Sequence, residues 1–166
     1  MTDKIEKIAL GGGCHWCTEA VFQSLKGVTK VEQGYVVSTG ENNSLSEAVI
    51  VHFNPAKISL SVLIEIHLRT HKSTSAHSMR QKYRSAVYFY DKDQEDKVLS
   101  ILEQLQNSFE KTIITQVLPF KSFKPTRKEL HNYYRKDPEK PFCKTFIDPK
   151  LKILRSRFSK HIRLNF

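Results

Sequence analysis

The chain has 166 residues, of which 39% are hydrophobic and 27% charged, and its formal net charge is +10. This length suits one well-packed domain over residues 1–166 and is too short for two ordinary domains. The sequence has no long apolar run, no apolar N-terminal core and three cysteines in all, which argues against a membrane span, export and a secreted disulfide framework, so we expect a cytoplasmic protein.

The first expected elements are a short buried strand over residues 5–10 and a helix that follows the three glycines at 11–13. The strand contains the apolar run 8–10, and apolar residues then recur at helical spacing from Trp16 to Val28. Gly27 marks the expected end of the helix, because glycine is common just beyond a helix C-terminus.

Cys14 is placed by this pattern in the first turn of the helix. Unpaired backbone N–H groups and the positive end of the helix dipole stabilise an anion there, so we expect the pKa of Cys14 to fall below the free value of about 8.5. Cys17 follows three residues later on the same helical face, within reach of a disulfide. We favour a redox pair over the alternative that both cysteines are small buried hydrophobic residues.

The middle of the chain alternates strands and helices, which indicates the α/β class. Residues 28–37 and 45–53 predict a hairpin around the turn 38–44, and Ser59 caps an expected helix that runs to about Thr70. An irregular polar stretch precedes an expected strand over 83–90, a helix from Asp91 to about Ser108 and a short strand over 112–118.

The C-terminal segment, from about residue 121, contains the whole excess of positive charge. Residues 121–166 hold 14 Lys/Arg and 4 Asp/Glu, whereas residues 1–120 hold 13 of each kind. Nucleic-acid binding is not favoured, because base-stacking motifs are missing; an acidic partner protein, such as a small acidic reductant, would suit this segment. A last amphipathic helix is expected from Asp148-Pro149, with Leu151, Leu154, Phe158 and Ile162 on one face.

A reactive cysteine that attacks an oxidised group also needs a proton donor. Glu47 lies inside an otherwise apolar strand, where a carboxyl facing an apolar pocket would have a raised pKa and could donate a proton near neutral pH. Tyr35 and Tyr83, each at a strand end, could donate hydroxyl hydrogen bonds. The alternative is that Glu47 faces solvent on an edge strand and that the tyrosines are core residues, and the residues alone leave both open.

Several short motifs resemble the peptide methionine sulfoxide reductase A family, in the same order and with comparable spacing. They are Gly13-Cys14-His15-Trp16-Cys17-Thr18-Glu19-Ala20-Val21-Phe22, Lys26-Gly27-Val28, Gly34-Tyr35, Glu47-Ala48-Val49, Asn54-Pro55, His71, Gln81-Lys82-Tyr83-Arg84-Ser85-Ala86, Leu130-His131-Asn132-Tyr133-Tyr134, and Phe142-Cys143 through Pro149-Lys150-Leu151. The resemblance implies a ferredoxin-like α/β sandwich with a mixed sheet flanked by helices.

The resemblance also implies roles for individual residues. Cys14 would attack the sulfur of methionine (S)-sulfoxide, free or in proteins, while Glu47 protonates the oxygen. Tyr35 and Tyr83 would hold that oxygen, and Trp16 would line the methyl pocket. The sulfenic acid on Cys14 would condense with a resolving thiol, for which Cys17 is the nearer candidate and Cys143 a second one. Thioredoxin, or dithiothreitol in vitro, would reduce the disulfide of a monomer with no bound cofactor.

Three positions depart from the family pattern around the substrate. His15 replaces the phenylalanine that lines the methyl pocket with Trp16, and near its usual pKa of about 6.5 it could pair with the Cys14 thiolate. Ser78 and Lys72 stand where the family has aspartates. We therefore expect retained thiol chemistry with altered binding of the sulfoxide, or of the protein that carries it, at His15 and Ser78.

Other functions remain open at this point. A divergent homologue could have lost efficient catalysis and act as a binding or regulatory protein. A CxxC pair beside an α/β pattern also fits a thiol–disulfide oxidoreductase, although tryptophan then lies between the cysteines rather than before them. A zinc site is the weakest alternative, because the isolated Cys143 does not supply a second cysteine pair.

Overall fold

The computed structural model describes residues 4–164 and residue 166. Six strands form a mixed sheet in the order β5-β4-β1-β3-β2-β6, in which only the β4–β5 pair is parallel. The strands are β1 (Glu6–Gly11), β2 (Val28–Val37), β3 (Ser46–Phe53), β4 (Ala86–Phe89), β5 (Gln116–Pro119) and β6 (Ser122–Pro125).

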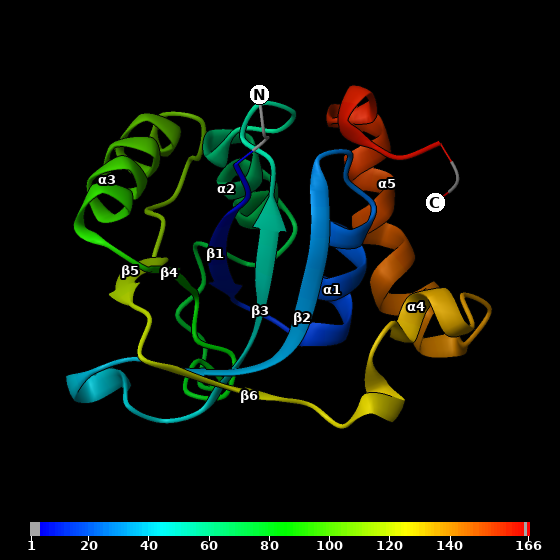
Figure 1. Ribbon diagram of the computed structural model, residues 1–166, viewed down its shortest axis with the longest axis horizontal. Coiled ribbons are helices and arrows are strands. Elements are labelled where there is room, and N and C mark those ends of the chain that lie inside the picture. The colour runs from blue at the N-terminus through cyan, green and yellow to red at the C-terminus, as the bar shows by residue number, and fades with distance from the viewer. Residues whose placement is uncertain (1–3, 165) are drawn as a thin grey trace.

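Helices flank this sheet, as Figure 1 shows. They are α1 (His15–Gln23), α2 (Leu60–Arg69), α3 (Lys92–Gln106), α4 (Tyr133–Lys136) and α5 (Asp148–Arg157), with a π-helical turn at Cys143–Ile147 and short 3-10 turns at Gly40–Asn42, Lys128–Leu130 and Ser159–His161. Helix α1 packs on β2 and β3 with α5 beside it, and α2 contacts α3, which lies against β4 and β5. Within the described residues, no helix combines the length and apolar character needed to cross a bilayer.

The chain order β1-α1-β2-β3-α2-β4 builds the antiparallel core β4-β1-β3-β2. This is the ferredoxin-like arrangement, and β5 and β6 extend it at the two edges. The expected α/β fold with a mixed sheet flanked by helices is therefore confirmed.

Alternation along β1 divides the interior into two apolar layers. Ile8 and Leu10 point into the larger layer, which the helices cover, while Ala9 points into a smaller layer with Ala48 and Tyr88. Fully burying a side chain such as Ile8 or Leu10 stabilises the fold by roughly 1.5–3 kcal/mol each. This burial fixes the strand whose end carries the reactive cysteine.

Several expected elements are shorter in the structure. Helix α1 ends at Gln23 rather than at Gly27, because Leu25 leaves it to form a bridge with Ile162 and Gly27 adopts φ +90° in the turn to β2.

The strand expected over 83–90 is reduced to Ala86–Phe89. The reason is that the N–H of Tyr83 donates to Met79 within a turn, while Arg84 turns inward to the carbonyl of Val36. Likewise β5 begins only at Gln116, since the N–H of Ile114 donates outside the sheet, to Ser73.

The C-terminal segment contains elements that the sequence pattern does not reveal. Strand β6 pairs with β2 at Gly34, where a Cβ would lie 2.3 Å from the carbonyl oxygen of Lys124, so glycine permits this close pairing. Helix α5 begins at Asp148 as expected but ends at Arg157, so Phe158 and Ile162 pack from beyond its end.

Candidate active site

Cys14 lies between the end of β1 and the first residue of α1 and is partly exposed. Its backbone carbonyl accepts hydrogen bonds from the N–H groups of Cys17 at 3.1 Å and Thr18 at 3.2 Å. It therefore occupies the N-cap position, one residue before the helix proper. There its side chain lies within reach of the unpaired N–H groups of the first turn.

The pKa of Cys14 is lowered, chiefly because the Cys17 thiol donates a hydrogen bond to its sulfur. Backbone N–H groups of Trp16 and Cys17 act in the same direction, whereas burial and the charge of Glu47 oppose the shift. The same hydrogen bond and burial raise the pKa of Cys17. The pair therefore favours a Cys14 thiolate beside a protonated Cys17.

Cys143 starts the π-helical turn and is fully buried. Its thiol donates to the carbonyl oxygen of Asp137 at 3.5 Å, and burial raises its pKa. A negative charge on the Cys143 thiolate would raise the pKa of Cys17, so the two sulfurs are close enough to interact electrostatically. All three cysteines are free thiols in this structure.

Glu47 is buried, with 6% of its surface exposed, on a central strand of the sheet. Its Oε1 accepts a hydrogen bond from the backbone N–H of His15 at 3.2 Å. The Nζ of Lys82 lies 3.8 Å from Oε2. The sequence left open whether Glu47 faces an apolar pocket or solvent, and in the structure its side chain is buried. Its negative charge raises the pKa of the Cys14 thiol.

Tyr35 and Tyr83 reach the same region from different elements. Tyr35 is the register partner of Glu47 on β2, and its ring meets the His15 ring edge-on at a centroid distance of 5.2 Å. Tyr83 precedes β4, and the Nζ of Lys82 lies 5.2 Å from the centroid of its ring. A side-chain hydrogen bond with Tyr83 raises the pKa of Lys82, and the charges of Tyr83, Glu47 and Tyr35 act in the same direction, so the ammonium lies among these side chains.

His15 faces Glu47 rather than Cys14. Its Nδ1 lies 3.1 Å from the carbonyl oxygen of Gly34 and 3.3 Å from Oε1 of Glu47. A carbonyl oxygen only accepts, so Nδ1 carries the proton, and burial lowers the pKa of the ring. A neutral imidazole bonded in this way does not form the pair with the Cys14 thiolate that the sequence left open.

Trp16 belongs to an aromatic wall beside the cysteine. Its ring stacks on Tyr133 with a centroid distance of 4.3 Å and an interplanar angle of 8°, and it meets Phe142 edge-on at 5.3 Å. Its indole N–H is buried and has no partner among the described residues. Sequence reasoning missed Tyr133 and Phe142, because only the fold brings them to Trp16.

Ser78 lies on an exposed loop and lines a cavity of about 440 Å³ together with Gly13 and Tyr83. Lys150, a residue that the sequence analysis gave no role, lines the same cavity. Its ammonium donates to the carbonyl of Thr70, and its charge lowers the pKa of Cys17. The Pro-Lys-Leu motif around it was the available signal.

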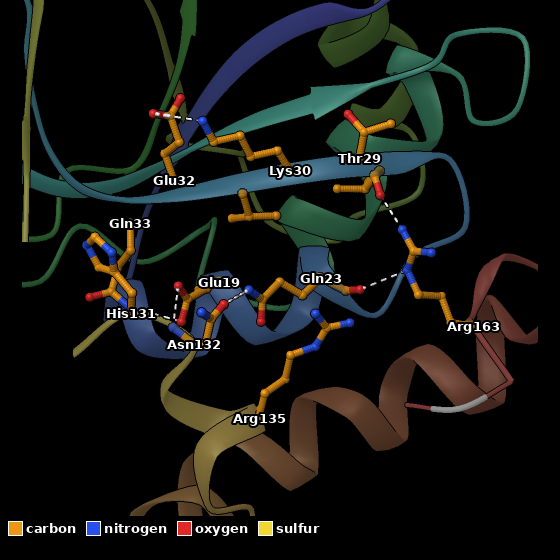
Figure 2. A pocket seen from close by; sticks show the side chains of 12 residues that line it. Glu19, Gln23, Thr29, Lys30, Glu32, Gln33, His131, Asn132, Arg135 and Arg163 are labelled. Atoms are coloured by element: carbon orange, nitrogen blue, oxygen red, sulfur yellow. Dashed lines mark hydrogen bonds and ion pairs between the residues drawn. The ribbon is translucent and has the colours of Figure 1, made fainter. Parts of the chain in front are cut away.

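Glu19 connects α1 to the C-terminal segment and is 1% exposed. Its carboxylate accepts hydrogen bonds from the backbone N–H groups of Asn132 at 3.0 Å and Tyr133 at 3.2 Å, and from the Gln33 amide at 3.0 Å. Figure 2 shows Glu19 directed toward Asn132. Because it anchors the start of α4, Glu19 fixes the position at which Tyr133 stacks on Trp16.

The cavity of about 320 Å³ in Figure 2 lies between β2, α1 and α4, and Cys14 does not line it. Arg163 crosses it to donate to the carbonyl oxygens of Gln23 and Val28, which fixes the C-terminal end of the chain on α1 and β2. Among the residues that the structure describes, no three His, Cys, Asp or Glu side chains gather in a way that could bind a metal ion.

The sequence and the fold of the chain are both similar to those of known proteins. The family model for peptide methionine sulfoxide reductase matches residues 6–162. The peptide methionine sulfoxide reductase MsrA of Trichodesmium erythraeum is 34% identical over 174 residues, covering 95% of this chain and 98% of that protein.

Two solved structures of Mxr1 from Saccharomyces cerevisiae are similar to the chain. The reduced form superposes with a TM-score of 0.75 at 23% identity, covering 86% of this chain and 91% of that chain. Mxr1 in complex with Trx2 superposes with a TM-score of 0.61 at 25% identity, covering 78% of this chain and 85% of that chain.

Proposed function

Since the chain belongs to the peptide methionine sulfoxide reductase family, we propose that Cys14 is the nucleophile with which it reduces methionine (S)-sulfoxide to methionine. The observation that carries this assignment is the lowered pKa of a partly exposed Cys14, bonded by Cys17 and by backbone N–H groups. A thiolate is the reactive form of cysteine, and the lowered pKa increases the fraction of Cys14 that is present as the thiolate. The protein is accordingly an oxidoreductase.

In the first step the Cys14 thiolate attacks the sulfoxide sulfur while the oxygen takes a proton from Glu47. The sulfur–sulfur bond formed in this attack breaks as the hydroxyl moves from the methionine sulfur to Cys14, which leaves methionine, reduced by two electrons, and a sulfenic acid on Cys14. Support for Glu47 in this position comes from its burial and from the influence of its charge on the Cys14 thiol, which indicates that the two side chains are close together. General acid catalysis of this kind contributes about 10²–10⁴-fold to a rate.

Tyr35 and Tyr83 are proposed to donate hydrogen bonds to the sulfoxide oxygen beside Glu47. Tyr35 is the register partner of Glu47, and Lys82 lies among all three side chains. Lys82 adds a positive charge where the oxygen becomes more negative as the sulfur is attacked. Trp16, backed by Tyr133, is proposed to contact the methyl group, with His15 and Ser78 as the remaining substrate contacts.

Cys17 is the proposed resolving residue. Its thiol would attack the sulfenic acid of Cys14 and release water, which leaves a Cys14–Cys17 disulfide. The hydrogen bond between the two thiols supports this choice. Cys143 is the second candidate. It is fully buried, which places it out of reach of substrate, but its charge acts on Cys17, so it could form a disulfide with Cys17 in a later exchange.

A dithiol protein of the thioredoxin type is the proposed reductant. Its thiolate would attack the disulfide, and its second thiol would release the two cysteines in reduced form. The related Mxr1 has been solved in complex with Trx2, which supports this assignment. Dithiothreitol would replace the protein reductant in vitro.

We also propose that the chain acts as one domain and as a monomer in the cytoplasm. Strand β1 lies in the middle of the sheet, and the C-terminal segment returns to contact α1. Both ends of the sequence therefore contribute to the same structural unit. Three free thiols suit a reducing compartment.

The function can be tested in a single turnover without reductant. The wild-type protein should convert one equivalent of N-acetylmethionine (S)-sulfoxide and lose two hydrogens as a Cys14–Cys17 disulfide, which peptide mass spectrometry locates. Cys17→Ser should still produce one methionine and leave a sulfenic acid on Cys14 that dimedone traps. Absence of turnover above the Cys14→Ser control would refute the proposal.

Two measurements separate the other functions. Rapid reduction of insulin by the protein with dithiothreitol, without sulfoxide turnover, would indicate a thiol–disulfide oxidoreductase instead. Binding of sulfoxide peptides without turnover, together with an ordinary rate of Cys14 alkylation at pH 7, would indicate a binding protein. We expect neither result.

A further inference from the structure

Two cavities adjoin each other on the Tyr83 side of the candidate site. The first, of about 440 Å³, is lined by Gly13 and Tyr83 and reaches His71 and Lys72. The second, of about 590 Å³, begins at the same His71 and Lys72 and reaches Phe109 and Arg157. Because they share two lining residues, we treat them as one surface, the basic groove, which runs from Gly13 to Arg157.

Among the described residues, the charged side chains that line the basic groove are all cationic: Arg69, Lys72, Lys150 and Arg157. Within the same part of the chain, no aspartate or glutamate lines either cavity. His71 and His77 also line it, and their pKa values are lowered, His71 mainly by burial, so both are neutral at pH 7. Each of the two cavities is therefore lined by cations, with Lys72 common to both.

Two of these cations are already engaged and two are available. The Nε of Arg69 lies 3.0 Å from a carboxylate oxygen of Glu65, and Lys150 donates to the carbonyl of Thr70. Lys72 and Arg157 are exposed, and within the described part of the chain neither has a carboxylate within ion-pair distance. They are free to meet a negatively charged ligand.

One end of the basic groove lies next to the candidate active site. Gly13 directly precedes Cys14, and Tyr83 is one of the residues proposed to contact the sulfoxide oxygen. Cys14 itself does not line the groove. A polypeptide that carries its oxidised methionine to Cys14 would enter the groove at Gly13 and Tyr83 and pass Lys72 toward Arg157.

We propose that the basic groove binds an acidic polypeptide segment next to the oxidised methionine, so that the protein selects methionine sulfoxides with aspartate or glutamate nearby. This inference rests on the proposed function. Complementary charges increase the rate of productive encounter and penalise partners of the same sign. The effect should appear in kcat/KM and should weaken as salt screens the charges.

The test compares three short peptides that contain one central methionine (S)-sulfoxide, flanked by acidic, neutral amide or basic residues. Dithiothreitol serves as reductant, so that no protein partner competes for the surface. At low ionic strength we expect kcat/KM to fall from the acidic to the basic peptide by about fivefold or more, since a few exposed ion pairs contribute this much. The difference should shrink at about 0.5 M salt.

The double variant Lys72→Glu, Arg157→Glu should lose or reverse the preference. Its kcat/KM on N-acetylmethionine sulfoxide amide, which carries no charge, should equal that of the wild type, and this control also reports on correct folding. Lys26→Glu reverses one exposed charge beyond the end of α1, outside the groove, and should keep the preference for the acidic peptide.

Equal kcat/KM for the three peptides in the wild type would overturn the inference, as would an unchanged preference in the double variant. Inhibition of acidic-peptide turnover by a short single-stranded oligonucleotide, without any preference among the peptides, would assign the groove to nucleic acid and equally overturn it. Failure of the proposed function is distinguishable, because the uncharged substrate would then not turn over at all.

Discussion

The Cys14 thiol receives opposing influences from its neighbours, and their balance defines the site. The Cys17 thiol and two backbone N–H groups lower its pKa, while burial and the Glu47 carboxylate raise it. A nucleophile and a proton donor must be close together to act on one sulfoxide. That proximity has a cost, because a negative charge on Glu47 makes the thiolate harder to form.

Replacing Glu47 with glutamine should separate these two effects. Without the general acid, kcat for N-acetylmethionine sulfoxide should fall about 100-fold or more. The pKa of Cys14 should decrease, because the carboxylate charge that raises it is gone. Iodoacetamide alkylation of Cys14, followed by mass spectrometry across pH, should therefore show a midpoint at lower pH than in the wild type.

The control for this prediction is Glu32→Gln, which removes a carboxylate on β2 that pairs with His52. It should leave both kcat and the alkylation midpoint unchanged. If Glu47→Gln instead kept the wild-type kcat, Glu47 would have no role as the acid. A fall in both kcat and alkylation rate would point to a damaged site rather than a missing proton donor.

At the scale of elements, the sequence predicted best the helices and strands whose caps, turns and β-branched residues lie in or next to the element itself. Ser59 was expected to cap a helix, and its hydroxyl accepts the N–H of Val62 at the start of α2. Asp91 caps α3 in the same way through the N–H of Gln94. Strand β2 has the expected bounds, Val28–Val37, because its β-branched residues lie within the strand and the turn residues that end it follow directly in the sequence.

The elements that the pattern missed depend on distant partners. Strand β6 requires the space left by Gly34, and the start of α4 is capped by Glu19, more than 100 residues earlier in the chain. The same holds for the site. Cys14 and Glu47 could be chosen from their chemistry, whereas Lys82, Tyr133 and Lys150 acquire their positions only from the fold.

A buried histidine on α2 forms a hydrogen bond with β1, and this makes the packing of α2 on β1 sensitive to pH. His67 donates from Nε2 to the carbonyl oxygen of Gly11 at 2.8 Å, and its Nδ1 has no partner among the described residues. Burial lowers its pKa from 6.5 to about 4. Protonation would place a second, unpaired N–H and a charge in the interior.

We therefore expect acid to destabilise the protein through His67. Between pH 6.5 and pH 4 the unfolded chain binds the proton and the folded one does not, so the free energy of unfolding decreases as pH falls through this window. The contribution between pH 7 and pH 5 is about 2 kcal/mol. Urea unfolding at the two pH values measures it.

His67→Gln tests this assignment, because the glutamine amide can still donate to Gly11 but cannot titrate in this range. The variant should lose less stability than the wild type when the pH is lowered from 7 to 5. An equal loss in both proteins would show that other groups, such as His71, cause the pH dependence.

At the scale of the whole molecule, the charge is concentrated in one part of the chain. Residues 121–166 hold 14 Lys/Arg against 4 Asp/Glu, and in the structure this segment packs on α1, the helix that carries Cys17. Cations on α5 such as Lys152 and Arg155 are exposed. A reductant protein that approaches the cysteines therefore meets a positive field, which accelerates the association of an acidic partner.

This asymmetry predicts how regeneration by an acidic thioredoxin depends on salt. With the uncharged N-acetylmethionine sulfoxide amide as substrate, kcat/KM for thioredoxin should fall several-fold between about 0.05 M and about 0.5 M salt, since screening removes the attraction. Turnover driven by dithiothreitol, a neutral reductant, should not change over the same range.

The double variant Lys152→Glu, Arg155→Glu should lower kcat/KM for thioredoxin at low salt and flatten its salt dependence. Lys57→Glu, an exposed reversal in the turn before α2, should do neither. A rate with thioredoxin that is independent of salt in the wild type would mean that the C-terminal charge does not steer the reductant.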